Sequence, residues 1–178
     1  MTVELWDIYD ENRVKKDGVM KRGEPIRDGD YHLVVHVCVF DREGRMLIQK
    51  RQPFKAGFSG LWDVTVGGSA VAGDTSRTAA ERELFEEVGI KVDLTGVRPY
   101  LSVNYDHGFD DFYLVEIDGC DPASLSLQYE EVEAVKWATE EEIVSMLRDG
   151  SFIPYYEHLI RLFFAMRGRY SVHVPGTV

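Results

Sequence analysis

Three carboxylates, Glu83, Glu86 and Glu87, recur at three- and four-residue spacing in one short stretch of the chain. On a helix these spacings place the side chains on neighbouring positions of one face. Like charges so close oppose helix formation by about 0.2–0.5 kcal/mol per pair. A hard cation such as Mg²⁺ or Mn²⁺ would remove that penalty, because such ions prefer oxygen ligands. The spacing therefore fits a metal site, with a solvated acidic face as the alternative.

A glycine-containing loop precedes these carboxylates. Gly67, Gly68 and Gly73 allow tight turns and a close approach of the backbone to a ligand. Arg82 lies beside the acidic stripe and is expected to hold one carboxylate by a charge-assisted hydrogen bond. The loop and the acidic stripe together fit a ligand site beside a metal, with the solvated acidic face still the alternative.

The elements that position these residues are a helix and the strands before it. The helix is expected to begin at a cap among residues 74–76 and to stop at Gly89 in the C′ position. Its core face is expected to be the stripe Ala80, Leu84 and Val88, which recurs every four residues.

The whole stretch from Gly68 to Ile90 resembles the Nudix signature, which reads Gly, five residues, Glu, seven residues, then Arg-Glu-aliphatic-x-Glu-Glu-x-Gly-aliphatic. Asp74 stands where the family usually has Glu. The resemblance implies an α/β fold, a three-layer α/β/α sandwich with a mixed β-sheet and a loop-helix-loop catalytic motif. It also implies hydrolysis of a diphosphate joined to another group, with a small-molecule diphosphate as substrate.

By residue match, the resemblance implies that Glu83, Glu86 and Glu87 bind Mg²⁺ or Mn²⁺ and form the catalytic set together with Arg82, which orients the glutamates. The carbonyl of Gly67 or Gly68 is an expected further ligand. The general base stays open between a glutamate of the Nudix signature (residues 68–90, the Nudix box) and an acid of a later loop. The later-loop candidates, which could equally be solvated loop carboxylates, are Asp106, Asp110, Glu130 and Glu131.

Basic side chains precede the box on a predicted strand and loop. Lys50, Arg51 and Lys55 are candidates for binding the diphosphate, since Arg51 can fork onto two oxygens. The alternative is an exposed strand end. Aromatic residues that could stack on a base are as readily core or rim residues: Tyr105, Phe109, Tyr155 and Tyr156.

Two rival functions are compatible with these residues. Residues 32–40, Arg51 and Lys55 are similar to type I isopentenyl-diphosphate isomerase, a Nudix-fold enzyme. However, Gly67 occupies the place of its catalytic Cys and Ser69 the place of a metal-binding His. The other rival is a Nudix module that binds without catalysis, although such modules usually lose box carboxylates.

Composition indicates which partners and which cellular location are expected for this chain. The chain has 178 residues and a net charge of −11, which argues against affinity for nucleic acid polymers or anionic membranes. Cys38 and Cys120 have no metal-type spacing and imply no disulfide framework. No apolar run is long enough to span a membrane, so a cytoplasmic location is expected. Family habit favours a homodimer.

The chain is expected to contain an N-terminal β arm (1–30), a Nudix hydrolase domain (31–170) and a tail (171–178). In the arm, residues 15–18 read as a turn. Further strands are expected at 32–40, 46–50, 61–66, 97–105, 111–117 and 132–138, with a hairpin tip at 106–110. Helices are expected from Thr139 to Leu147, with Glu142 completing a capping box, and from Pro154 to about Met166.

Overall fold

The computed structural model describes residues 3–171, 173, 174 and 176. The chain divides into two compact units, the first formed by residues 1–37 and 66–113 and the second by residues 38–65 and 114–178. The predicted arm and domain boundaries stay predictions. The predicted tail, residues 171–178, lies partly outside the described residues.

The first unit begins with two antiparallel strands, β1 (Leu5–Tyr9) and β2 (Lys15–Lys21). We call residues 5–21 the N-terminal hairpin. The predicted turn at 15–18 is wrong, because those residues belong to β2. The reversal occurs earlier, where the Asp10 carboxylate accepts from the backbone N–H groups of Asn12 and Val14 at 2.9 and 2.8 Å. These local hydrogen bonds stabilise the turn at residues 10–14. The Lys-Asp-Gly sequence at 16–18 is also typical of turns, but it lies within β2.

Strand β3 (His32–Phe40) pairs in this unit with β6 (Val66–Ser69), and Val35 faces Gly68 in the antiparallel register. Strands β7 (Leu101–Tyr105) and β8 (Gly108–Glu116) form a hairpin. Its turn is shorter than the predicted tip at 106–110, since Tyr105 pairs with Gly108. Two-residue loops are favoured in hairpins.

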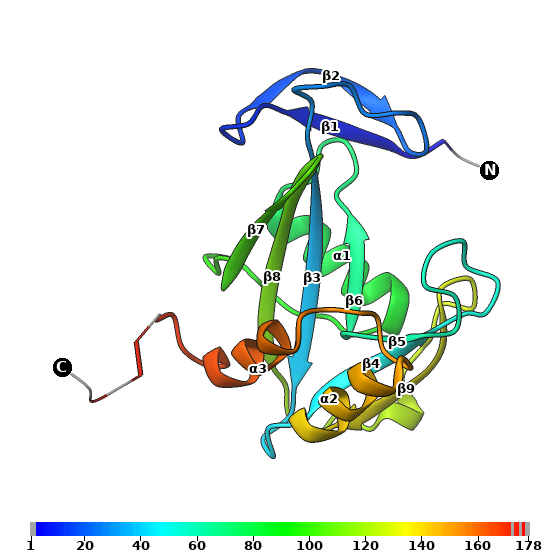
Figure 1. The fold of residues 1–178 in the computed structure, drawn as a ribbon, viewed down its shortest axis with the longest axis vertical. Helices are drawn as coiled ribbons and strands as arrows, with labels where there is room; N and C mark the ends of the chain where they lie inside the picture. The colour runs from blue at the N-terminus through cyan, green and yellow to red at the C-terminus, as the bar shows by residue number, and fades with distance from the viewer. Residues whose placement is uncertain (1–2, 172, 175, 177–178) are drawn as a thin grey trace. The chain divides into compact units, whose positions relative to one another are not determined.

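Helix α1 (Ser76–Val88) carries the acidic stripe. Thr75 caps it through a reciprocal box with Thr78, and Gly89 ends it in a left-handed conformation at φ 75°. The predicted stripe of Ala80, Leu84 and Val88 is fully buried. In Figure 1 the N-terminal hairpin lies beside the loop that leads from β6 into α1. Local capping and burial of one face together explain where this helix starts, stops and packs.

The second unit contains β4 (Met46–Arg51), β5 (Trp62–Asp63) and β9 (Val132–Ala138), together with the end of β3. The expected single strand at 61–66 is split into β5 and β6. Asp63 accepts from the Val64 N–H at 2.7 Å, and the Thr65 hydroxyl donates to the Leu47 carbonyl at 2.5 Å. Between β5 and β6, these side-chain hydrogen bonds replace the backbone hydrogen bonds of a continuous strand.

The remaining elements of the second unit are η1 (Pro122–Ser124), α2 (Glu140–Asp149) and α3 (Glu157–Met166). Thr139 and Glu142 form the predicted capping box, and Gly150 closes α2. Helix α3 begins at Glu157 rather than at Pro154, because the Ile153 N–H bonds to the Trp62 carbonyl at 2.8 Å and keeps the preceding segment extended.

The predicted α/β class with a mixed sheet is confirmed. The ladders described above are antiparallel, and an isolated bridge between Trp62 and Phe152 is parallel. Among the described residues, no helix combines the length and apolar character that crossing a membrane requires.

Candidate functional site

Two glycines of β6 make room for side chains that come from other elements. A Cβ added to Gly68 would lie 2.3 Å from the carboxyl carbon of Glu83. A Cβ added to Gly67 would lie 2.8 Å from Nδ1 of His36. Both distances are shorter than real side chains tolerate, so any residue larger than glycine would displace Glu83 or His36. The glycines therefore serve close packing against the box helix and β3.

Arg82 links the loop to the acidic helix. Its Nη2 and Nε donate to Asp74 Oδ2 at 2.9 and 3.2 Å, and Nη2 also donates to the Ser69 carbonyl at 3.2 Å. Its Nη1 donates to Glu83 Oε1 at 2.9 Å and to Glu86 Oε2 at 3.1 Å. Asp74, although shorter than Glu, therefore reaches the arginine.

The charge balance around Arg82 remains negative, because three carboxylates share one guanidinium. Burial opposes the charge of Arg82, but Glu83 and Asp74 outweigh it and raise the pKa of the guanidinium. Burial raises the pKa of Glu83, Arg82 opposes this, and the carboxylates of Glu86 and Glu4 reinforce it. The site thus holds more negative charge than its one arginine compensates.

The three box glutamates differ in exposure. The Glu86 side chain is 50% exposed, the Glu83 side chain is 13% exposed, and Glu87 is 4% exposed as a whole residue. The helix thus presents Glu86 to solvent, packs Glu83 against Gly68 and buries Glu87.

The donor set suits a hard divalent cation, because the box offers carboxylate oxygens. Glu83 and Glu86 each place an oxygen within hydrogen-bond distance of the same Arg82 nitrogen, so these two carboxylates already converge. Over the described residues, no three His, Cys, Asp or Glu side chains are yet gathered closely enough to enclose an ion. Glu87, the third predicted ligand on the same helix, is 4% exposed, and its metal-binding role stays a prediction.

The three predicted diphosphate-binding cations lie in the second unit, and each contacts protein oxygens there. Lys50 pairs with Glu133 at 2.9 Å and Lys55 with Glu131 at 2.5 Å. Arg51 donates from Nε to the Gly57 carbonyl at 3.1 Å. Their binding role stays a prediction, and a substrate would have to compete with these partners.

One of the candidate general bases, Asp110, lies next to the imidazole of His36 on β3. Asp110 Oδ1 lies 3.3 Å from Nε2 of His36, whose ring stacks on Phe112 with centroids 4.6 Å apart. Glu131 is paired with Lys55. Asp106 lies in the β7–β8 turn, and Glu130 lies in the turn before β9. None of the four assignments is tested by these contacts.

The candidate stacking residues are mostly engaged with protein. The Tyr105 hydroxyl lies 3.1 Å from the His32 ring nitrogens, Phe109 is buried near Tyr31, and the Tyr155 hydroxyl donates to Asp63 at 2.9 Å. Tyr156 is 85% exposed.

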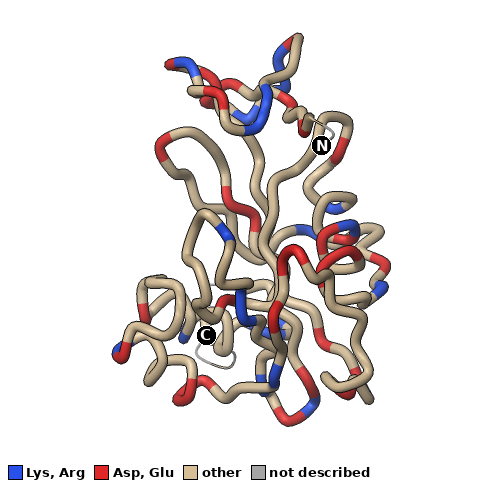
Figure 2. Tube along the Cα trace, turned by 90° about the vertical axis from the view of Figure 1, so that its right-hand side faces the viewer, with Lys and Arg blue, Asp and Glu red and all other residues tan. Residues whose placement is uncertain are grey.

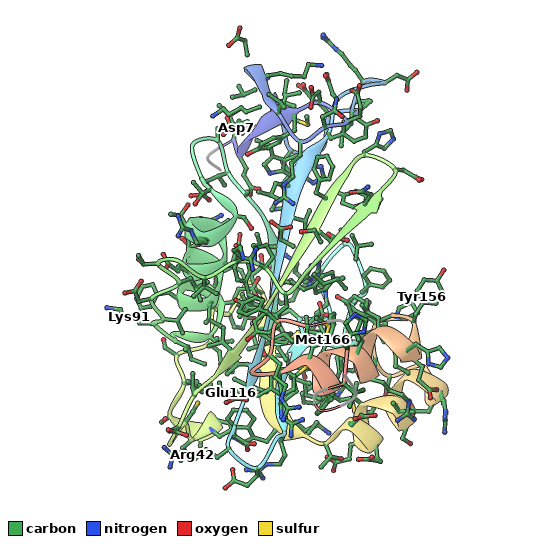
Figure 3. All side chains as sticks on the ribbon, turned by 90° about the vertical axis from the view of Figure 1, so that its left-hand side faces the viewer. Asp7, Arg42, Lys91, Glu116, Tyr156 and Met166 are labelled. Atoms are coloured by element: carbon green, nitrogen blue, oxygen red, sulfur yellow. The ribbon has the colours of Figure 1, made fainter. Side chains whose placement is uncertain are left out.

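Sequence reasoning missed a second group of charged residues in the first unit, at Asp7, Arg13 and Asp111. Asp111 is fully buried and forms an ion pair with Arg13. Asp7 accepts a hydrogen bond from the Gly73 N–H at 2.9 Å, and Figure 3 shows its side chain beside the loop before α1. The available signal was an acidic residue inside the apolar run of β8, where a buried charge needs a partner.

Comparison with known proteins places this geometry in a family. The model of the NUDIX domain matches residues 30–160. A protein of Listeria monocytogenes named as an uncharacterized Nudix hydrolase is 40% identical over 96% of this chain and 99% of its own length. An isopentenyl-diphosphate Delta-isomerase of Streptomyces coelicolor is 28% identical over 85% of this chain and 79% of its own length. The crystal structure of a Deinococcus radiodurans protein has a TM-score of 0.72 at 23% identity, covering 89% of this chain and 98% of that one.

Proposed function

The chain belongs to the NUDIX family of hydrolases, and from this premise we propose that it is a Mg²⁺-dependent enzyme that cleaves a diphosphate joined to another group by attack of water on phosphorus. The observation that carries the proposal is the convergence of Glu83 and Glu86 on Arg82, directly beside Gly68. Three carboxylates around one guanidinium leave the excess of negative charge that a divalent cation would neutralise.

Phosphoryl transfer depends mainly on positioning and on neutralising charge. When bound, Mg²⁺ would supply charge neutralisation for the diphosphate and an activated water as nucleophile. Among the chain's own residues, Glu83, Glu86 and Glu87 would hold the ion, and the Gly67 carbonyl would add a ligand. Arg82 holds two of these carboxylates in place.

Lys50, Arg51 and Lys55 of the second unit are proposed as diphosphate-binding residues on the chemistry of their side chains alone. Guanidinium and ammonium groups suit phosphate oxygens, and Arg can contact two of them at once. The substrate proposed here is a small molecule, and a homodimer stays the expected assembly.

The test is a release assay with purified protein, Mg²⁺ or Mn²⁺, and a panel of diphosphates. The panel contains nucleoside triphosphates, ADP-ribose, nucleotide sugars, dinucleoside polyphosphates and isopentenyl diphosphate. The Glu87→Gln protein is assayed beside the wild type, with Glu141→Gln, an exposed residue of α2, as the matched control. Release of phosphate or nucleotide by the wild type and the control alone supports the proposal. Metal binding with no turnover of any compound would favour a binding module instead.

Isomerase activity is a second candidate because the Streptomyces coelicolor relative carries that name. The residues of the site argue against isomerase activity. Gly67 stands where the isomerase has its catalytic Cys, and a Cβ there would meet His36 at 2.8 Å. Cys38 is buried, and burial raises the pKa of its thiol well above the ordinary value. Formation of dimethylallyl diphosphate from isopentenyl diphosphate would establish the isomerase instead.

A further inference from the structure

Asp111 is a fully buried carboxylate that is surrounded by donors. Arg13 contacts both of its oxygens, with Nη1 at 2.9 Å from Oδ1. The Ser102 hydroxyl donates to Oδ1 at 2.6 Å, and the Ser76 hydroxyl donates to Oδ2 at 2.5 Å. The hydrogen bond to Asp111 raises the pKa of Arg13, so the guanidinium stays charged. A buried carboxylate with this set of donors is held in a fixed position.

Ser76 connects this carboxylate to the box helix. It is the first residue of α1, and its hydroxyl also lies 2.8 Å from the Tyr113 hydroxyl. Ser76 precedes Glu83 by seven residues, which is about two turns of helix, so both side chains lie on the same face. Fixing Ser76 therefore fixes the rotation of the face that carries Glu83.

The N-terminal hairpin also contacts the loop before α1. The Ala72 N–H donates to the Leu5 carbonyl at 2.7 Å, and the Gly73 N–H donates to Asp7 Oδ2 at 2.9 Å. Lys15 pairs with the same Asp7 oxygen at 2.7 Å. The hairpin thus contacts the loop directly and reaches the first residue of the helix through Arg13 and Asp111.

The backbone of Arg13 is held in the turn of the N-terminal hairpin. It lies in the turn of the hairpin with φ at 64°, a left-handed conformation that is uncommon for non-glycine residues. Its N–H donates to the Asp10 carbonyl at 3.0 Å, so the turn holds the backbone from which the guanidinium extends to Asp111.

We propose that Arg13 is a positioning residue of the box helix, acting through Asp111 and Ser76, so that the N-terminal hairpin is part of the apparatus that aims the metal-binding carboxylates. The inference rests on the proposed function for its effect on turnover. The link between the hairpin and the helix itself is independent of that function.

The test compares Arg13→Met with Lys16→Met. Both changes remove one cation from the hairpin, but Lys16 pairs with Asp30 and has no described contact with the loop or α1. Three properties are measured on each full-length protein: amide hydrogen exchange of the segment 70–85, Mn²⁺ affinity by calorimetry, and kcat and KM on the substrate found in the panel. Ser76→Ala is the second variant, because it keeps the buried ion pair and removes only the helix anchor.

We expect Arg13→Met to exchange faster at segment 70–85, to bind Mn²⁺ about tenfold more weakly and to lose about 10–100-fold in kcat with little change in KM, as is typical when a residue that orients metal ligands is removed. Ser76→Ala should show the same pattern more weakly. Arg13→Lys, which keeps the charge but not the fork, should recover part of the loss.

Unchanged exchange and Mn²⁺ affinity in both Arg13→Met and Ser76→Ala, relative to Lys16→Met, would overturn the inference. If Arg13→Met does not fold, Ser76→Ala alone decides in the same way. If the wild type hydrolyses nothing, the proposed function fails, while faster exchange in Arg13→Met and Ser76→Ala would still support the link between hairpin and helix.

Discussion

Arg82 and Arg13 of the first unit each bind carboxylates, and their two centres differ in charge balance. Arg82 is shared by Asp74, Glu83 and Glu86 at 2.9–3.1 Å, and Glu86 is half exposed. Arg13 forms an ion pair with Asp111, which is fully buried and also accepts from two serine hydroxyls. The first centre keeps an excess of negative charge, and the second is balanced.

The difference distinguishes the proposed cation site from a centre that holds the structure together. A buried carboxylate must be compensated within the protein, because unpaired burial is costly. A partly exposed group of carboxylates can instead be compensated by an ion from solvent. Figure 2 shows that acidic and basic residues are also interspersed along the N-terminal hairpin, whose described ion pairs include Lys15 with Asp7 and Lys16 with Asp30. The box differs from the hairpin because its carboxylates outnumber the nearby cations, whereas Lys15 and Lys16 of the hairpin are each paired with one carboxylate.

The largest effect is expected from removing a box carboxylate. Glu86→Gln or Glu87→Gln should lower kcat by roughly 10²–10³-fold while circular dichroism stays unchanged, because charge stabilisation in the transition state is lost. The exposed Glu141→Gln serves as the control. Wild-type turnover in both variants would remove the distinction between the two arginine centres.

A smaller loss is expected from Arg82→Lys. Lysine keeps the charge but cannot reach Asp74, Glu83, Glu86 and the Ser69 carbonyl together, so kcat should fall by about 10–100-fold. Asp74→Asn should lose less, since it removes one of several partners. Equal loss in both variants would show that Asp74, rather than the arginine fork, orients the glutamates.

Adding metal should stabilise the protein through the box alone. Mg²⁺ at 100 times its dissociation constant contributes about 2.7 kcal/mol, which corresponds to an increase in Tm of about 5–10 °C for a chain of this size. EDTA should reverse the increase, and Glu86→Gln/Glu87→Gln should not show it. An equal increase in the double variant would place the ion elsewhere.

The smallest effect is expected at Asp7, in the contact between hairpin and loop. Burial alone would raise the pKa of Asp7, but hydrogen bonds from Lys15 and the Gly73 N–H lower it below its ordinary value of 3.8. Such a carboxylate stabilises the fold above its unfolded pKa, and this stabilisation is lost as the pH falls through the folded pKa. Asp7→Asn should therefore lower Tm by about 2–4 °C at pH 7, for a loss of about 1 kcal/mol. In thermal melts from pH 7 to pH 2, the difference should shrink as the pH falls below 3.8 and vanish below the folded pKa. A constant difference at every pH would assign the effect to packing rather than to charge.

Local signals explain what could be predicted. The Thr139 and Glu142 capping box and the Gly89 stop depend on residues within one turn, and the structure has both. Predictions failed where side chains compete with the ladder. Asp10 moves the first turn ahead of Lys15, and Thr65 with Asp63 splits a predicted strand.

The resemblance of residues 68–90 to the Nudix signature indicated the family. The sequence by itself also determined the box helix with its caps and buried stripe, and the three glutamates on neighbouring turns, because helical periodicity is set by residues three and four apart. Only the tertiary structure decided that Glu87 is buried while Glu86 is exposed, and that Arg13 reaches Asp111 across 98 positions of the chain. Burial of Glu87 and the pairing of Arg13 with Asp111 both depend on how segments far apart in the sequence come together and on which face of each strand points into the core. No short stretch of sequence contains that information, because it arises when the hairpin, β8 and α1 pack together.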